Sequence, residues 1–211
     1  MTRHKGSRNK GYEEEKQRLA RRLFEALVSA GDEGPSFRQL AAACDVSPST
    51  LRHYFVDRKG AIQAAIEHAG IGGKPHLELV RCGEFGTAHE ALLALLRYLS
   101  FGWQHSELGN LHRVGLEAGL SDSKAGKTYL ASILEPAVQA FADRIQLHID
   151  RGELKPCTPR FAALSLLSPV LLAMLHQKQL SGEEQWPLSI DDFLQEHVDF
   201  FLQAHSLEPA A

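Results

Sequence analysis

The sequence predicts an all-α protein of about nine helices. Apolar residues recur at spacings of three and four through most of the 211 residues, and no stretch of useful length shows the polar–apolar alternation of a half-buried strand. Glycine and proline gather at a few points between the periodic segments, where they indicate turns. A chain of this length can bury a core, and we expect an N-terminal domain over residues 1–70 and a larger helical domain over residues 71–211.

The composition is that of an ordinary globular chain, but its charge is unevenly distributed. Hydrophobic residues make up 44% and charged residues 23% of the sequence, and the net charge is −3. Residues 1–60 carry 12 Lys or Arg against 8 Asp or Glu, a charge of +4, which leaves −7 for residues 61–211. A basic end on an acidic body favours a protein that presents only that end to DNA.

Cysteine use and hydropathy point to a reducing, cytoplasmic setting. Cys44, Cys82 and Cys157 lie far apart and form no CxxC, so the sequence supports neither a disulfide framework nor a cysteine zinc site. The N-terminus lacks the apolar segment of a signal peptide. The longest uncharged apolar run, Phe161–Leu175, is shorter than a spanning helix requires and contains Pro169, so we expect a buried or interface helix.

The first 30 residues predict a basic arm and one helix. Residues 1–11 are polar and carry Arg3, Lys5, Arg8 and Lys10; we expect an arm without regular structure, which either reaches a minor groove or is simply solvated. The helix is expected from Tyr12 to Ala30, because its apolar residues form one stripe: Leu19, Leu23, Phe24, Leu27 and Val28.

Residues 36–62 predict two short helices joined by a tight turn and followed by a third helix. Ser36 is a suitable N-cap for the first helix, and Asp45 can adopt the left-handed conformation that a sharp turn needs. Ser47 caps the second helix, with Pro48 in its first turn, where a missing N–H costs nothing. This second helix carries short hydrogen-bonding and basic side chains, the mixture that a helix in a DNA major groove requires.

The rest of the chain predicts further helices only. One is expected from Asp57, its N-cap, to Ala69, with Gly70, Gly72, Gly73 and Pro75 breaking the chain after it. The later helices are expected over these ranges: Thr87–His105, Leu108–Leu120, Lys124–Arg151, Pro159–Leu180 and Ile190–His205.

The segment from Ser36 to Ile62 resembles the helix-turn-helix of the tetracycline-repressor (TetR) family of bacterial transcriptional regulators. The matching residues are Leu40, Ala41, Val46, Ser47, Leu51, Tyr54, Phe55, Arg58 and Ile62. The sequence departs from the family pattern at four positions. The family usually has Gly where this chain has Asp45 and Tyr where it has Arg52. It usually has His in place of Tyr54 and Lys in place of Arg58. The change at Arg52 leaves open which side chain makes the usual phosphate contact.

The resemblance implies a dimeric, ligand-responsive regulator, most simply a repressor, that binds a pseudo-palindromic operator. The residues expected to contact DNA are Arg38, Ser47, Pro48, Ser49, Thr50, Arg52, His53, Tyr54, Arg58 and Lys59. The last two long helices carry more apolar surface than one face needs, so they either lie in the core or meet a partner. The resemblance implies that they form a four-helix interface with a second copy. The expected interface residues are Phe161, Leu164, Leu167, Leu171, Phe193, His197, Phe200 and Phe201.

The resemblance also implies an effector pocket among the middle helices. Expected ligand contacts are Leu95, Leu99, Trp103, His112, Arg113, Leu116, Leu134, Val138 and Phe141, although each apolar member taken alone fits plain core better than a ligand contact. Breaks at Gly102, Gly109, Gly115 and Gly119 would let a central segment shift.

Two other classes of function remain as alternatives. The larger domain could respond to a protein partner instead of a small molecule. An enzyme is disfavoured, because the sequence has no HExxH, no GxSxG and no glycine-rich phosphate loop, and no metal or cofactor is expected.

Overall fold

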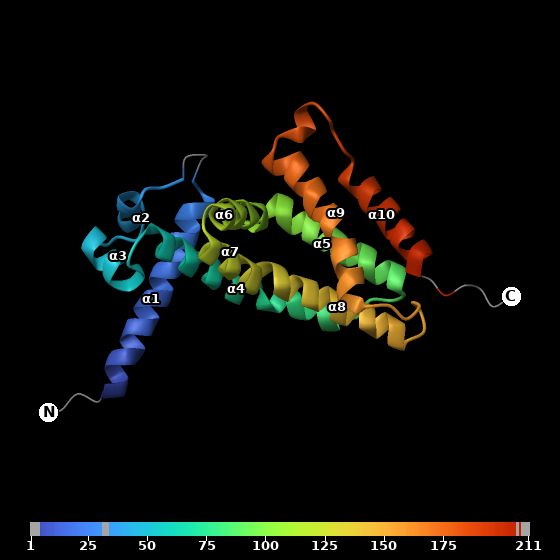
Figure 1. Ribbon diagram of the computed structural model, residues 1–211, viewed down its shortest axis with the longest axis horizontal. Coiled ribbons are helices and arrows are strands. Elements are labelled where there is room, and N and C mark those ends of the chain that lie inside the picture. The colour runs from blue at the N-terminus through green and yellow to red at the C-terminus, as the bar shows by residue number, and fades with distance from the viewer. Residues whose placement is uncertain (1–4, 31–33, 206, 208–211) are drawn as a thin grey trace. The chain divides into compact units, whose positions relative to one another are not determined.

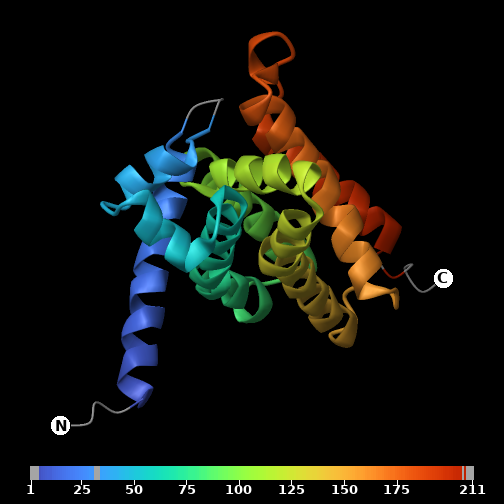
Figure 2. The ribbon, with the colours of Figure 1, turned by 60° about the vertical axis from the view of Figure 1, so that its left-hand side comes forward.

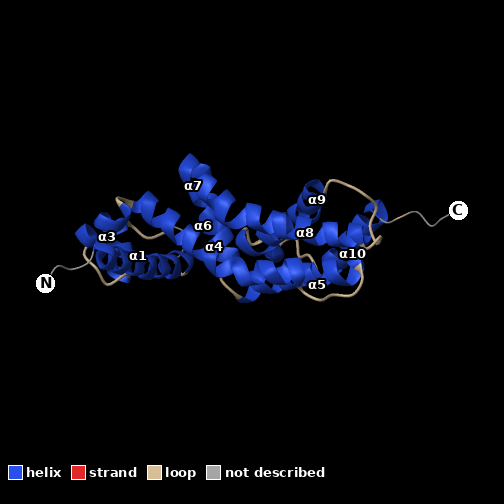
Figure 3. Ribbon diagram, turned by 90° about the horizontal axis from the view of Figure 1, so that it is seen from below, coloured by secondary structure: helices blue, strands red, loops and turns tan. Residues whose placement is uncertain are grey.

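The computed structural model describes residues 5–30, 34–205 and 207, and every regular element within them is a helix (Figure 3). The helices are α1 (Lys5–Val28), α2 (Phe37–Ala43), α3 (Pro48–Phe55), α4 (Arg58–Cys82), α5 (Ala88–His105), α6 (Leu108–Ser121), α7 (Ser123–Tyr129), α8 (Glu135–Asp150), α9 (Pro159–Met174) and α10 (Ile190–His205). A π-helical turn, Leu130–Leu134, joins α7 to α8 without a break. Counted as continuous helices, these are nine within the described residues, and the predicted all-α class is confirmed.

The chain divides into two compact units. The first unit comprises residues 1–73 and 110–133, and the second comprises residues 74–109 and 134–211. Helices α4 and α6 each contribute to both units (Figure 1). The first unit therefore contains α1 to α3, the start of α4, most of α6, and α7.

The first helix begins earlier than the sequence predicted. α1 starts at Lys5, so Lys5, Arg8 and Lys10 belong to a helix rather than to an irregular arm, whereas Arg3 lies outside the described residues. Lys10 lies 4.0 Å from Glu14, one turn further along α1. Such i,i+4 pairs stabilise a helix, and the prediction gave them no weight.

The local signals in the helix-turn-helix are confirmed. Ser36 and Gln39 form a capping box, in which the Ser36 hydroxyl accepts the Gln39 N–H and the Gln39 side chain accepts the Ser36 N–H. Asp45 is left-handed, with φ of 57°. The Ser47 hydroxyl accepts the Thr50 N–H and caps α3. The core beneath α1, α2 and α3 includes fully buried leucines: Leu19, Leu23, Leu40 and Leu51.

Glycine was misread as a helix breaker in α4 and α6. α4 continues past Gly70, Gly72, Gly73 and Pro75 to Cys82, and α5 and α6 run unbroken through the four glycines expected to interrupt them. Three of these glycines instead allow close packing. A Cβ at Gly70 would lie 2.5 Å from the main-chain carbonyl oxygen of Ser132. A Cβ at Gly115 would lie 2.3 Å from the Tyr129 ring, and a Cβ at Gly119 would lie 3.0 Å from the Gly126 Cα.

The second unit is built around α5, α8, α9 and α10. α8 packs along α9, and α10 packs along both α5 and α9 (Figure 2). Their core includes Leu95, Phe141, Leu166 and Val198, all fully buried. Arg144 is also fully buried, and its Nε and Nη2 donate to the carbonyls of Val80 (2.7 Å) and Gly83 (2.8 Å) at the end of α4.

The helix that begins at Pro159 is longer than its apolar run suggested. α9 continues through a π-helical turn to Gln179, and Pro159–Gln179 is long and apolar enough to cross a membrane by length and composition. The predicted helix over Pro159–Leu180 is confirmed to within one residue at its end, and the uncharged run Phe161–Leu175 is only its central part. One such helix is weak evidence for a membrane span, because core and interface helices have the same character.

An unusual turn links α3 to α4. Val56 has φ of 66° and ψ of −57°, and the Asp57 N–H donates to the Phe55 carbonyl at 2.7 Å, which defines a γ-turn with positive φ. A β-branched residue rarely adopts this conformation. The Phe55 carbonyl points at Gly60, where a Cβ would lie only 2.1 Å away. Asp57 closes the turn by accepting the Gly60 N–H at 2.8 Å, as its predicted N-cap role requires.

Val56→Gly should stabilise the protein. The Val56 side chain is 73% exposed, so its removal loses little packing, whereas glycine adopts positive φ without strain. We expect the free energy of unfolding to rise by about 1 kcal/mol, measured by urea denaturation. Val56→Ala is the control, because alanine keeps the Cβ that causes the strain. Equal stabilisation by both substitutions would contradict the assignment.

Candidate DNA interface and effector sites

Nine of the ten residues predicted to contact DNA are exposed in the first unit. Ser47, Pro48, Ser49, Thr50, Arg52 and His53 on α3 are exposed, as are Arg38, Arg58 and Lys59, whereas Tyr54 is half-buried. Leu51 and Phe55 face the core and fix the helix in place. α3 thus turns its polar side chains outward in the arrangement that a groove-reading helix needs.

Hydroxyl groups at the start of α3 are already organised. Ser47 Oγ lies 2.7 Å from Ser49 Oγ and 2.8 Å from Thr50 Oγ1, and it also accepts the Thr50 N–H at 3.0 Å. Ser47 Oγ already has three partners, whereas the exposed hydroxyls of Ser49 and Thr50 retain capacity for a further hydrogen bond. Such groups can donate to phosphate oxygens or to acceptors on base edges.

Aromatic contacts hold the second half of α3. Tyr54 stacks on Tyr12 of α1 with ring centroids 4.8 Å apart, and His53 meets Tyr12 edge-on at 5.8 Å. The Arg52 guanidinium lies 5.7 Å from the centre of the Phe37 ring on α2. These contacts restrict the rotamers of the exposed side chains and explain why Tyr54 is only half-buried. Tyr12 was expected only as the start of α1.

The two cations that open α4 have partners within the first unit. Arg58 Nε donates to the Pro35 carbonyl at 2.8 Å, and Lys59 Nζ lies 2.8 Å from Asp122 Oδ2. Asp122 also caps α7, because its Oδ1 accepts the N–H groups of Lys124 and Ala125. The Lys59–Asp122 pair could not be predicted, since the two residues are separated by 63 positions.

The residues expected to contact an effector do not lie in one unit. Leu95, Leu99, Trp103, Leu134, Val138 and Phe141 belong to the second unit, and His112, Arg113 and Leu116 belong to the first. Leu95, Trp103, Val138 and Phe141 are members of the second unit's core cluster. Arg113 Nη2 donates to the Ala30 carbonyl at 3.1 Å, beyond the end of α1, and Nη1 lies 3.2 Å from Glu117.

His112 lies in a buried polar pair that the sequence revealed only in part. Its Nδ1 is 2.6 Å from the hydroxyl of Tyr129, which was not among the predicted residues. Burial lowers the pKa of His112 from 6.5 to about 4 and raises the pKa of Tyr129. The pair is therefore neutral near pH 7. Gly115 leaves the space that the Tyr129 ring occupies.

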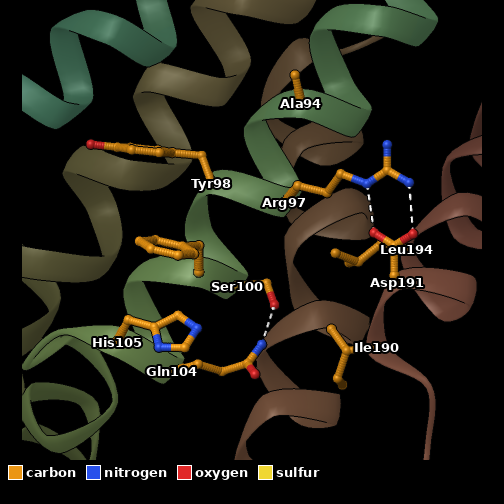
Figure 4. A pocket seen from close by; sticks show the side chains of 10 residues that line it. Ala94, Arg97, Tyr98, Ser100, Gln104, His105, Ile190, Asp191 and Leu194 are labelled. Atoms are coloured by element: carbon orange, nitrogen blue, oxygen red, sulfur yellow. Dashed lines mark hydrogen bonds and ion pairs between the residues drawn. The ribbon is translucent and has the colours of Figure 1, made fainter.

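An open groove of about 610 Å³ lies on the second unit between α5 and the start of α10 (Figure 4). Arg97 forms a two-pronged ion pair with Asp191 at 2.6 and 2.8 Å across one side of it. Gln104 donates to Ser100 at 3.0 Å, and the ring of His105 lies 4.5 Å from that of Phe101. None of the residues lining this groove was among the predicted effector contacts.

The residues expected at a dimer interface differ in exposure. Phe161 is 68% and Phe200 64% exposed, and Leu164 is also exposed. Leu167, Leu171, Phe193 and His197 are half-buried, and His197 Nε2 bonds the Leu166 carbonyl at 2.8 Å. Phe201 is only 6% exposed and packs in the core of its own unit, so it does not lie on an exposed face.

Metal-ligating side chains do not converge in the part of the chain that the structure describes. Within residues 5–30, 34–205 and 207, no group of three His, Cys, Asp or Glu side chains is placed to hold a metal ion. The described cysteines are free, with Cys44 buried and Cys82 exposed.

A capped helix-turn-helix with an exposed polar second helix, joined to a larger helical unit, defines a class of DNA-binding transcriptional regulators. Residues 90–206 match the family described as AefR-like transcriptional repressor, C-terminal domain, which covers more than half of the chain. The chain belongs to the TetR family of transcriptional regulators. No curated protein sequence matches it significantly.

Solved structures of the same fold are distant in sequence. A protein from Mesorhizobium loti MAFF303099 described as a TetR-family transcriptional regulator is 18% identical, with 93% of this chain and 98% of that chain covered and a TM-score of 0.78. SmeT, the repressor of the Stenotrophomonas maltophilia multidrug efflux pump SmeDEF, is 15% identical, with 92% and 91% covered and a TM-score of 0.64. AibR, solved with isovaleryl coenzyme A and operator DNA, is 18% identical, with 90% and 96% covered and a TM-score of 0.57.

The buried His112 should make stability depend on pH. Its pKa is about 4 in the folded protein and near 6.5 in the unfolded chain. Its contribution to the free energy of unfolding is therefore complete above pH 6.5 and is lost as the pH falls towards 4. We expect this residue alone to remove up to about 3 kcal/mol of unfolding free energy over that range. His112→Asn, which keeps an acceptor near Nδ1, should flatten the pH profile measured by urea denaturation.

Exposed His105→Asn is the matched control for that measurement, because it removes a histidine without changing a buried group. Some pH dependence should persist in the His112 variant, since burial also lowers the pKa values of His68 and His148. An unchanged profile in His112→Asn would show that this histidine is not neutral and buried in solution.

Proposed function

We propose that the protein is a transcriptional repressor that binds a pseudo-palindromic operator as a homodimer and is released by a small-molecule effector. The observation that carries the proposal is the exposed face of α3, with Ser47, Ser49, Thr50 and Arg52 directed away from the core. In this role α3 lies in the major groove, its hydroxyls and Arg52 near base edges and phosphates, and His53 and Tyr54 near the backbone. Arg38, Arg58 and Lys59 add phosphate contacts.

Residues 1–70 are proposed as the DNA-binding domain and residues 71–211 as the effector-binding and dimerisation domain. A single helix-turn-helix reads too few base pairs for useful specificity, so two heads about one DNA turn apart are needed. Phe161 and Phe200 expose large apolar surfaces on α9 and α10. A second copy of the same two helices would cover them in a four-helix arrangement.

The effector is proposed to bind the second unit and to act by population shift. It must bind the released conformation more tightly than the DNA-bound one, because equal affinity would shift nothing. AibR was solved with both a coenzyme A thioester and operator DNA, which supports the combination of a small molecule and DNA on one protein of this fold. Leu95, Leu99, Trp103, Val138 and Phe141 are the proposed contacts in the second unit.

A protein partner is the second candidate for the signal received by the larger domain. The groove between α5 and α10 is open rather than enclosed, and Phe101 at its edge is 63% exposed. Aromatic side chains such as this one are enriched in protein interfaces. Native mass spectrometry of freshly purified protein separates the two cases, since a retained small molecule adds a mass that denaturation removes.

The same proposal places the protein in the cytoplasm and assigns it no enzymatic activity. TetR-type regulators bind DNA and generally catalyse no reaction. The basic first 60 residues and the acidic remainder suit a protein that presents one end to DNA.

Arg52→Ala should weaken operator binding by about tenfold or more. The guanidinium is exposed on α3 and stacks on Phe37, so its removal costs a DNA contact but little core packing. The measurement is fluorescence anisotropy at fixed salt, with an operator selected from genomic fragments by the wild-type protein. Arg151→Ala, an exposed arginine after α8, is the matched control. Unchanged affinity in Arg52→Ala would show that α3 is not the recognition helix.

Phe200→Glu should convert the dimer to a monomer. A carboxylate at the centre of an apolar interface loses its hydration and has no partner. Sedimentation velocity should show the monomer, with unchanged helical circular dichroism, because the Phe200 side chain is exposed in one subunit. Leu120→Glu, at an 87% exposed position on α6, should leave the dimer intact. A dimeric Phe200→Glu protein would place the interface elsewhere.

A further inference from the structure

A carboxylate between α6 and α7 holds one of the cations that open α4. Lys59 Nζ and Asp122 Oδ2 are 2.8 Å apart, with the lysine side chain 65% and the aspartate side chain 24% exposed. The hydrogen bond from Lys59 lowers the pKa of Asp122, and the same bond raises the pKa of Lys59. Both groups are therefore charged at neutral pH.

Asp122 cannot follow the lysine if the lysine moves. Its other oxygen accepts the N–H groups of Lys124 (3.1 Å) and Ala125 (3.0 Å), which fixes the carboxylate at the start of α7. The turn that carries it is also fixed, because α6 and α7 approach so closely at Gly119 that a Cβ there would lie 3.0 Å from the Gly126 Cα.

α6 is in turn tied to α1. Arg113 Nη2 donates to the Ala30 carbonyl at 3.1 Å, and Nη1 is 3.2 Å from Glu117 on the next turn of α6. Lys59, Asp122, Arg113 and Glu117 all line a crevice of about 210 Å³ within the first unit. The acidic partner of Lys59 is thus anchored by two backbone N–H groups beside a second ion pair, and is not a loose surface residue.

The neighbouring cation is held differently. Arg58 donates to a neutral main-chain carbonyl, that of Pro35, at 2.8 Å. An arginine with that partner keeps its full charge and its other N–H donors for a phosphate. Lys59 instead has a compact ammonium whose charge is matched by Asp122. An ammonium drawn to a DNA phosphate must leave Asp122, so the two contacts compete.

We propose that Asp122 is an internal competitor of DNA phosphate for Lys59 and thereby sets the DNA affinity of the first unit. The inference rests on the proposed DNA-binding function of this unit. In the conformation described here the Lys59–Asp122 pair is closed. Any movement of the α6–α7 turn that separates the pair frees Lys59 for DNA, and any movement that tightens it withholds the lysine. Asp122 acts through Lys59 and is a positioning residue.

The test is a double-mutant cycle with Asp122→Asn and Lys59→Gln. Asparagine keeps the oxygen that caps α7 but loses the charge that holds Lys59. The probe is a mixed-sequence DNA duplex of about 30 base pairs, because the phosphate contact does not depend on sequence. Anisotropy titrations over a salt series give both the affinity and its salt dependence.

Asp122→Asn should bind roughly two- to tenfold more tightly at low salt, with the advantage fading as salt screens the pair. Lys59→Gln should bind more weakly and lower the slope of log K against log salt by about 1.8 for a dimer, which is about 0.9 for each lost phosphate contact. In the Lys59→Gln background, Asp122→Asn should have no effect beyond that of its overall charge change.

Two variants control for charge alone. Asp150→Asn makes the same charge change at an exposed position of α8 in the second unit, and Lys127→Gln removes an exposed lysine from α7. Circular dichroism of Asp122→Asn should match the wild type, since the cap is kept. If Asp122→Asn tightens binding equally with and without Lys59, the effect is general electrostatics and the competition is refuted.

The possible failures are distinguishable. If the wild type binds the duplex in a salt-dependent manner but Lys59→Gln leaves the affinity unchanged both alone and in the Asp122→Asn background, Lys59 makes no phosphate contact and the inference is overturned while DNA binding stands. If the wild type shows no salt-dependent DNA binding, the proposed function fails and the inference fails with it.

Discussion

The continuity of α4 is the constraint on which the rest of the structure depends. This single helix of 25 residues carries Arg58 and Lys59 at its start, next to α3, and ends at Cys82 in the second unit. Its end is held by a buried guanidinium, since Arg144 donates to the last carbonyls, where the helix dipole favours a cation. The two units therefore share one continuous helix, whose first part belongs to the first unit and whose last part belongs to the second.

Buried polar groups set the register in which the helices of the second unit pack against each other. Arg144 and His148 lie one turn apart on α8, both fully buried, and Glu153 accepts hydrogen bonds from His148 and from the Ala88 N–H at the start of α5. Arg144 Nη1 and His148 Nε2 have no hydrogen-bond partner among the described residues. Burying such groups costs desolvation energy, so they are weak evidence for added stability. These polar groups instead fix how α8 meets the α4–α5 turn, because any other register would leave more donors and acceptors unpaired.

Local signals in the sequence were reliable, whereas glycine was ambiguous. Ser36, Asp45 and Ser47 act within three or four residues of themselves, so their roles could be predicted and are confirmed. Gly70 was taken for a break because no single chain shows what lies opposite it. Its partner, Ser132, is distant in sequence, and only the fold reveals that the glycine permits contact. The missing β-carbon looks the same in a turn and at a close helix crossing.

The same physical cause explains which contacts at the candidate sites could not be predicted from the sequence. The exposed face of α3 could be predicted from helical periodicity, because the buried positions Leu51 and Phe55 leave the others to solvent. The partners of Lys59 and His112 could not, since Asp122 and Tyr129 come from other helices. Periodicity assigns a residue to a face of its own helix but does not say what faces it. A charge at the start of α4 therefore predicted a phosphate contact, while the carboxylate that competes for that charge became visible only once α7 was in place.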